Sequence, residues 1–222
     1  MPKMFLDYGH GGNDPGAING KNYEKDFNLQ IGKQVKAHLE RHKQTVLESR
    51  KGDESVTLNE RSNKANHNNV DIVVSLHCNS SIKTSANGIE IFHHEKSKRG
   101  KELANSVLKS LVKSQVFKSN RGLKTNNFHM TRETKAPSVI VEMGFISNAN
   151  DLNALQTKQE EISKAVAKGI LNFYGMMWYD EEKIETVPKY FVQAGAYKKR
   201  ENAEKLVKKL KEKGFDAIIK EG

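Results

Sequence analysis

The chain has 222 residues, a formal net charge of +10, a hydrophobic content of 36% and a mean hydropathy of -0.72. This length allows one domain of common size plus a small second unit, and the longest apolar run, 72–74, is far too short to cross a membrane. The positive charge favours a polyanionic partner, such as an acidic lipid or cell-wall polymer. No helix-turn-helix, zinc-finger or RNA-binding motif accompanies it, so nucleic acid is an alternative on composition alone.

Cysteine content and the first residues bear on the compartment. The single cysteine, Cys78, excludes an internal disulfide, so the fold does not depend on an oxidising environment. Residues 1–5 lead directly into an apolar stretch, without the charged segment and apolar core of a secretory signal. We therefore expect synthesis in the cytoplasm and a non-standard route for any export.

A histidine set among glycines follows the first predicted strand. Phe5 and Leu6 predict a short buried strand, and glycines flank His10 in a turn where no neighbouring side chain screens the imidazole. Such a ring suits a metal ligand, although a histidine in a glycine-rich turn is more often an ordinary loop residue. The choice depends on which other groups the fold brings to the same place.

Strands and helices then alternate along the chain. Apolar residues at helical spacing predict helices, and Thr57 and Thr157, each followed by a glutamate three positions later, predict capping boxes that begin two of them. The basic segment 121–124 is expected to be a loop. The alternation predicts an α/β fold, with helices over 24–39, 57–67, 101–116 and 157–173 and strands over 45–47, 70–76, 88–92 and 137–145.

Ionisable side chains stand at the ends of these elements. His77 directly follows a strand, Glu24 begins a helix on the face that packs against the sheet, and Glu142 lies near the end of an otherwise apolar strand. Functional groups in an open α/β sheet gather at the carboxyl ends of the strands, so His10 and His77 are expected together. For Glu24, the structural alternative is a first-turn glutamate favoured by the helix dipole. For Glu142, it is an edge-strand glutamate that faces water.

His10, Glu24 and His77 supply two imidazoles and one carboxylate, the ligand set of catalytic zinc sites that keep a fourth position for water. Glu142 is the candidate base, which takes a proton and delivers it to a leaving amine. Cys78 is expected to be inert, because adjacent strand residues point to opposite faces. The other histidines are expected at the surface or at the rim of the site: His38, His42, His67, His93, His94 and His129.

Six stretches occur in a fixed order: GHGGNDPGA at 9–17, EKDFNL at 24–29, L-x-x-R-x-x-x-A-N at 58–66, SLHCNS at 75–80, NGIE at 87–90 and PSVIVEMGF at 137–145. Together they resemble the zinc-dependent N-acetylmuramoyl-L-alanine amidases of the amidase-3 type, over residues 3–175. The resemblance implies that His10, Glu24 and His77 bind one Zn²⁺ and that Glu142 is the catalytic glutamate. It also implies a twisted, mostly parallel sheet of about six strands flanked by helices.

The substrate implied by the resemblance is the amide between muramic acid and L-alanine in peptidoglycan. Two alternatives remain at this point. A zinc peptidase that cuts stem or cross-bridge peptides would use the same ligands, whereas a non-catalytic wall-binding protein would lack one of the four site residues, all of which are present.

A second unit is expected after residue 179. The acidic segment 180–188 is typical of a linker, and 190–195, 201–213 and 215–219 predict a strand, a helix and a strand. The unit 189–222 is similar to half of a SPOR-type cell-wall-binding domain, so a homodimer through this unit is one expectation. The combination resembles phage endolysins and sporulation autolysins, which reach the wall after host or mother-cell lysis.

Overall fold

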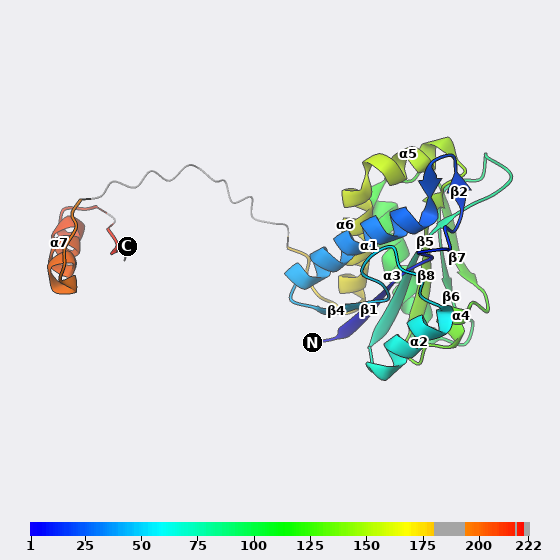
Figure 1. Ribbon diagram of the computed structural model, residues 1–222, viewed down its shortest axis with the longest axis horizontal. Helices are drawn as coiled ribbons and strands as arrows, with labels where there is room; N and C mark the ends of the chain where they lie inside the picture. The colour runs from blue at the N-terminus through cyan, green and yellow to red at the C-terminus, as the bar shows by residue number, and fades with distance from the viewer. Residues whose placement is uncertain (180–193, 216, 220–222) are drawn as a thin grey trace. The chain divides into compact units, whose positions relative to one another are not determined.

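The computed structural model describes residues 1–179, 194–215 and 217–219, and the chain divides into two compact units, Met1–Tyr179 and Asp180–Gly222 (Figure 1). The predicted linker 180–188 lies outside the described residues.

The first unit is built on a six-stranded sheet in the order β4-β1-β5-β8-β6-β7 (Figure 1). Strands β4, β1, β5 and β8 are parallel, whereas β6 pairs antiparallel with β8 and parallel with β7. The predicted mostly parallel six-stranded sheet is therefore confirmed. The strands are β1 Lys3–Tyr8, β4 Thr45–Glu48, β5 Ile72–Asn79, β6 Ile89–His93, β7 Asn120–Thr125 and β8 Ser138–Phe145, and a separate hairpin pairs β2 Ile18–Asn19 with β3 Asn22–Tyr23.

The strand directions decide which residues meet at one edge of the sheet. The carboxyl ends of β1, β5 and β8 lie together, and they carry or precede His10, His77 and Glu142. Because β6 runs opposite to β8, the amino-terminal ends of β6 and β7 reach the same edge. Glu90 and Arg121, each the second residue of its strand, therefore belong to this edge as well.

Helices cover both faces of the sheet (Figure 1). The larger core lies between the sheet and α1, α3 and α6, and the smaller core, built around Phe5, Val73 and Met130, lies on the opposite face with α2 and α4. Among the described residues no helix has the length and apolar character needed to cross a membrane. The helices of the first unit are α1 Glu24–Arg41, α2 Leu58–His67, α3 Lys98–Ser114, α4 His129–Arg132, α5 Ala149–Thr157 and α6 Gln159–Phe173.

Helix α1 shows how the apolar pattern builds this core. Phe27, Ile31, Val35 and Leu39 recur every four residues and are all buried, so one stripe of the helix packs against the sheet. Glu24 lies on the same side one turn earlier, and it is only 4% exposed. The core stripe thus brings a carboxylate into the interior at the first turn of the helix.

Two local predictions are wrong. The segment around Arg121 is not a loop but the edge strand β7, because its backbone pairs with β6; Leu123 supplies one half-buried apolar side chain, too little for a recognisable alternation. Thr57 forms the predicted capping box with Glu60, but Thr157 does not cap α6. Thr157 is still part of α5, and its hydroxyl donates to the Asn153 carbonyl one turn earlier.

In the second unit the described residues form helix α7, Arg200–Glu212, which begins and ends one residue before the predicted helix 201–213. The predicted strand over 215–219 is wrong for Phe215 and for 217–219, none of which is in a strand. The strand predicted over 190–195 lies mostly outside the described residues, and Ala194 and Gly195 are not in a strand. A strand needs a hydrogen-bonding neighbour, and apolar composition alone does not supply one.

Candidate metal-binding active site

Three side chains converge at the carboxyl edge of the sheet. One potential ligand atom from each of His10, Glu24 and His77 lies within 4.8 Å of the other two. Glu24 Oε1 is 3.2 Å from His10 Nε2 and 2.9 Å from His77 Nδ1, and the two imidazole rings lie edge to face at 5.0 Å. The structure thus brings together the three residues that the sequence pattern selected as metal ligands.

The backbone of His10 adopts a left-handed conformation, with φ of 62°. Such a conformation costs a non-glycine residue about 1–3 kcal/mol, so the surrounding structure must hold it. The other ring nitrogen, Nδ1, lies 2.8 Å from Asp14 Oδ2. A carboxylate bonded to the far nitrogen fixes the tautomer and orientation of a metal-binding imidazole, which leaves Nε2 free to act as a ligand.

Glu24 is held from several directions. Its Oε2 accepts the Ala17 N–H at 2.9 Å, and its Oε1 accepts the Cys78 N–H at 3.1 Å and the Asn28 amide at 3.2 Å. These donors come from the loop before the β2–β3 hairpin, from β5 and from the next turn of α1. The carboxylate is therefore preorganised between the two histidines.

Hydrogen bonding shifts the pKa values of the three groups. Burial lowers the pKa of His10, but hydrogen bonds to Glu24 and Asp14 outweigh it and raise that pKa to about 9. Burial also lowers the pKa of His77, but the hydrogen bond to Glu24 outweighs it, and the pKa is raised. Burial raises the pKa of Glu24, but the two imidazoles outweigh it and hold that pKa below its usual range. Two imidazoles on one carboxylate form a cationic cluster, and a metal ion takes the place of protons in such a cluster.

Glu142 lies beside this cluster on β8, opposite His77 on β5 and opposite Glu90 on β6. Burial raises the pKa of Glu142 to about 7, although the nearby His77 opposes the shift. Its Oε2 is buried and has no hydrogen-bond partner among the described residues. A buried carboxyl oxygen without a partner, next to a set of metal ligands, suits a group that exchanges a proton with water or substrate.

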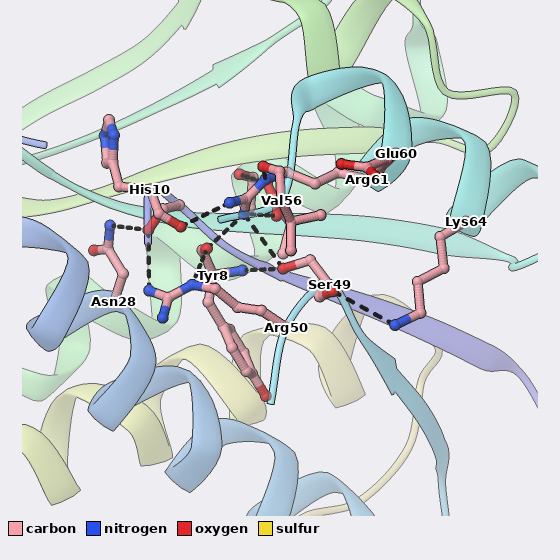
Figure 2. Close-up of polar contacts among 12 residues, drawn as sticks. Tyr8, His10, Asn28, Ser49, Arg50, Val56, Glu60, Arg61 and Lys64 are labelled. Atoms are coloured by element: carbon pink, nitrogen blue, oxygen red, sulfur yellow. Dashed lines mark hydrogen bonds and ion pairs between the residues drawn. The ribbon is translucent and has the colours of Figure 1, made fainter. Parts of the chain in front are cut away.

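Two buried arginines hold the backbone that carries His10. Figure 2 shows the guanidinium groups of Arg50 and Arg61 pointing toward the segment from Tyr8 to His10. Arg61 donates to the carbonyls of Tyr8 and His10, each at 2.6 Å, and Arg50 donates to those of Tyr8 and Gly9 at 3.0 and 3.2 Å. The carbonyls of three consecutive residues are thus fixed by charged donors, which holds the left-handed turn at His10 in place.

The same arginines connect this turn to the rest of the site. Arg50 also donates to the Lys25 carbonyl at 2.6 Å, in the first turn of α1 next to Glu24. Arg61, on α2, also binds Asp7 Oδ1 at 2.7 Å and the Val56 carbonyl at 2.8 Å. Both arginines are nearly inaccessible to solvent, so they act as an internal frame.

The prediction that the remaining histidines lie at the surface or rim is wrong for three of them. His38, His42 and His93 are buried. His42 packs its ring 4.4 Å from Trp178, which follows α6. His38 follows Glu24 by 14 helical residues, a rise of about 21 Å, so it lies far from the candidate metal-binding cluster.

Cys78 is buried, and burial raises the pKa of its thiol well above its usual range. A thiol in this state is a poor ligand and nucleophile. Its backbone N–H, in contrast, belongs to the site because it donates to Glu24.

Four residues around the site were not selected from the sequence as functional. Asp14 orients His10, Asn28 supports Glu24, and Arg50 and Arg61 hold the His10 backbone. For Arg61 a signal was present, because an arginine stands on the buried stripe of α2 one turn before Ala65. Arg50 follows strand β4 in a polar loop, and no local pattern distinguishes it from a surface arginine.

Comparison with known proteins gives the family. Residues 4–172 match the family model described as N-acetylmuramoyl-L-alanine amidase, and residues 186–222 match the SPOR domain model. The chain is 34% identical to the sporulation-specific N-acetylmuramoyl-L-alanine amidase of Bacillus subtilis, over 99% of this chain and 84% of that protein. It is 32% identical to the N-acetylmuramoyl-L-alanine amidase CwlM of Bacillus licheniformis, over 99% and 85%.

The solved structures agree. The catalytic domain of CwlV, an N-acetylmuramoyl-L-alanine amidase from Bacillus (Paenibacillus) polymyxa var. colistinus, superposes with a TM-score of 0.75 and 32% identity, over 80% of this chain and 100% of that one. AmiC2 of Nostoc punctiforme gives a TM-score of 0.75 and 32% identity, over 78% and 97%. The chain therefore belongs to the Amidase_3 family of N-acetylmuramoyl-L-alanine amidases, peptidoglycan hydrolases, and it carries a SPOR domain at its C-terminus.

Proposed function

We propose that the amidase works with one Zn²⁺ held by His10, Glu24 and His77, and that Glu142 is its catalytic acid–base. Two imidazoles and one carboxylate are a ligand set that zinc accepts in catalytic sites. The donor atoms fit such an ion because they lie within 4.8 Å of one another, and because Asp14 leaves Nε2 of His10 available. When bound, zinc supplies Lewis-acid chemistry, which polarises the scissile carbonyl and makes water a stronger acid.

The role of Glu142 follows from its position. Its buried Oε2 lies without a described partner next to the ligand cluster, where it accepts a proton from the attacking water. The same oxygen then delivers the proton to the departing nitrogen of L-alanine, which leaves as an amine while the lactyl group becomes a carboxylate.

The observation that carries this proposal is the convergence of the three candidate ligands beside Glu142, whose buried Oε2 has no partner among the described residues, in a chain of this family. The direct test is mass spectrometry of the products from purified peptidoglycan, with the native enzyme, with chelator, and with chelator followed by added zinc. We expect new N-terminal L-alanine and intact lactyl-bearing glycan, loss of both with chelator, and recovery with zinc. New N-termini within the stem or cross-bridge peptides would instead indicate a peptidase.

We also propose that the C-terminal unit binds peptidoglycan, since residues 186–222 match the SPOR domain model. Its charge supports contact with anionic cell-wall polymers, because residues 189–222 contain ten lysines and arginines against five acidic residues. We expect weaker retention on purified cell walls for a chain that ends at residue 179, and retention that falls as the salt concentration rises. Nucleic acid is not part of the proposal.

We further propose a homodimer through this unit. Helix α7 has no buried residue among those described, although Leu206, Val207 and Leu210 lie on one side of it. A second copy would cover this side of the helix. Sedimentation of the full chain should give a concentration-dependent dimer, and the chain that ends at residue 179 should remain monomeric; a full chain that stays monomeric at high micromolar concentration would contradict the dimer.

We also propose where the enzyme acts. The likeness to a sporulation-specific amidase supports an enzyme made in the cytoplasm that acts at the cell wall after lysis releases it. Fractionation of producing cells before and after lysis tests this, and the protein should move from the soluble to the wall fraction.

A further inference from the structure

A row of charged side chains runs from Glu142 on β8 across β6 to β7, in the direction away from His77 on β5. Glu90 on β6 lies opposite Glu142 on β8. On the neighbouring strand β7, Arg121 Nε and Lys124 Nζ both donate to Glu90 Oε2. The site edge therefore continues from the ligands through Glu142 and Glu90 to two cations.

The combined charge of Arg121 and Lys124 is larger than the charge of Glu90 that they neutralise. Glu90 is 4% exposed, and its Oε1 already accepts the Asn79 amide at 2.7 Å. Two positive groups on one carboxylate leave a net positive charge, and the side chains of Arg121 and Lys124 remain 36% and 37% exposed. The pair is thus a fixed, solvent-accessible positive charge beside the catalytic glutamate.

Arg121 has the geometry of a carboxylate receptor. Its guanidinium lies 4.9 Å from the ring centroid of the buried Phe145, which fixes the plane of the group. Among the described residues its only hydrogen bond is made by Nε, so its two terminal nitrogens remain available. Two parallel N–H groups of a fixed guanidinium match the two oxygens of a carboxylate.

The order of the groups across the sheet indicates which part of the substrate meets this pair. The carbonyl side of the scissile amide belongs at the metal ligands, and the departing nitrogen belongs at Glu142. The peptide that begins at that nitrogen then continues in the direction from β8 to β7. Two strand spacings are about 10 Å, which is the reach of about three extended residues.

We propose that Arg121 and Lys124 form a carboxylate-binding subsite for the peptide arm of the substrate, within about three residues of the scissile bond. The inference rests on the proposed function, because it needs Glu142 at the leaving nitrogen. Glu90 orients both cations, and Phe145 holds the guanidinium plane. The enzyme thereby distinguishes muramoyl peptides by the charge on the peptide.

The test uses the full-length enzyme and two synthetic N-acetylmuramoyl tripeptides that begin with L-alanine. One has all peptide carboxyl groups free and the other has them amidated. We expect kcat/KM to be about 10- to 100-fold higher for the free acid, as for one strong hydrogen-bonded charge pair. In Arg121→Gln this ratio should fall to within about twofold of unity, and Lys124→Met should lower it independently.

Arg99→Lys is the matched control for Arg121→Lys. Arg99 also stacks on a phenylalanine, Phe173 at 4.7 Å, and lies beside Glu102, but it is in the first turn of α3, which follows the carboxyl end of β6, the opposite end of that strand from Glu90. Its replacement should leave the ratio unchanged, whereas Arg121→Lys should reduce it because lysine lacks the two parallel donors.

Equal rates for the two peptides with the native enzyme would overturn the subsite. An equal fall in kcat/KM for both peptides in Arg121→Gln, with their ratio retained, would also overturn it, since that pattern means a structural role. Cleavage of both peptides at the lactyl amide in either case would leave the proposed function intact. Cleavage elsewhere would contradict the proposed function instead.

Discussion

Replacement of Arg61 by methionine tests the internal frame that holds the turn carrying His10, a proposed zinc ligand. The Arg61 guanidinium makes hydrogen bonds of 2.6 to 2.8 Å to Asp7, to the carbonyls of Tyr8 and His10 and to that of Val56. Methionine fills similar volume but leaves the Asp7 carboxylate, only 1% exposed, without its cation. Breaking a buried ion pair on one side costs about 3–5 kcal/mol.

This magnitude is large against the stability of a single domain, which is about 5–15 kcal/mol. For a unit of this size it corresponds to a fall in Tm of about 6–20 °C. Loss of the guanidinium also removes its hydrogen bond to the His10 carbonyl, which helps to hold His10 in its left-handed conformation. Zinc affinity should therefore fall together with stability. Thermal unfolding and zinc titration of the purified variant measure the two effects.

The ion pair between Asp7 and Arg61 also makes the stability depend on pH. Burial raises the pKa of Asp7, but attraction to Arg61 and hydrogen bonds from Ser75 and Arg61 outweigh it and hold that pKa below its usual range. A lowered pKa adds stability above the unfolded value, about 3.9, and this stability is lost as the pH falls through the folded pKa. In Arg61→Met burial dominates and the pKa of Asp7 rises, so the variant regains stability as the pH falls.

The difference in unfolding free energy between the native enzyme and Arg61→Met should therefore be largest near pH 7 and narrow toward pH 4. Arg61→Lys should recover part of the stability, since it returns a cation to Asp7, but not the zinc affinity, since lysine cannot bind both carbonyls in a fork. Arg99→Met, at a side chain 62% exposed, is the control and should change stability by less than about 0.5 kcal/mol. A difference below about 1 kcal/mol, or one that is constant from pH 4 to pH 8, would refute the assignment.

Three further predictions concern the site. His77→Ala should lose both bound zinc, measured by elemental analysis, and activity; a metal-free variant with full activity would rule out the ligand set. Glu142→Gln should keep its zinc and its retention on cell walls but lose at least about 10²–10⁴-fold in kcat, and near-normal turnover would mean that another group exchanges the proton. In Gly9→Ala the new Cβ would lie 2.2 Å from His77 Cε1, so the imidazole ring must move. Zinc affinity should then fall about 10- to 100-fold. The control Gly52→Ala, whose new Cβ has its nearest neighbour at 3.5 Å, should bind zinc normally.

The local patterns of the chain determined the class of fold and the candidate chemistry. Apolar runs identified the central strands, and the four-residue spacing from Phe27 to Leu39 identified the helix that carries Glu24. Histidines at strand ends and glutamates at apolar positions stand out in the sequence, because a buried charge is costly unless it has a partner. These signals are local, so they do not need the tertiary structure.

Tertiary pairing decided what local pattern could not. Strand β7 exists because β6 supplies hydrogen bonds to a polar, glycine-containing segment, and the reversed direction of β6 places Glu90 opposite Glu142. His38 and His42 look like surface residues in a charged helix end, but the segment after α6 covers them.

The frame around His10 depends on the same kind of contact. Arg50 lies more than forty residues from the carbonyls of Tyr8 and Gly9 that it binds, and Arg61 more than fifty from those of Tyr8 and His10. Hydrogen bonds between segments so far apart in the chain leave no periodicity in the sequence. The choice of His10, Glu24 and His77 as candidate ligands was therefore a local property, whereas their preorganisation came only from the way the fold brought three distant segments to one edge of the sheet.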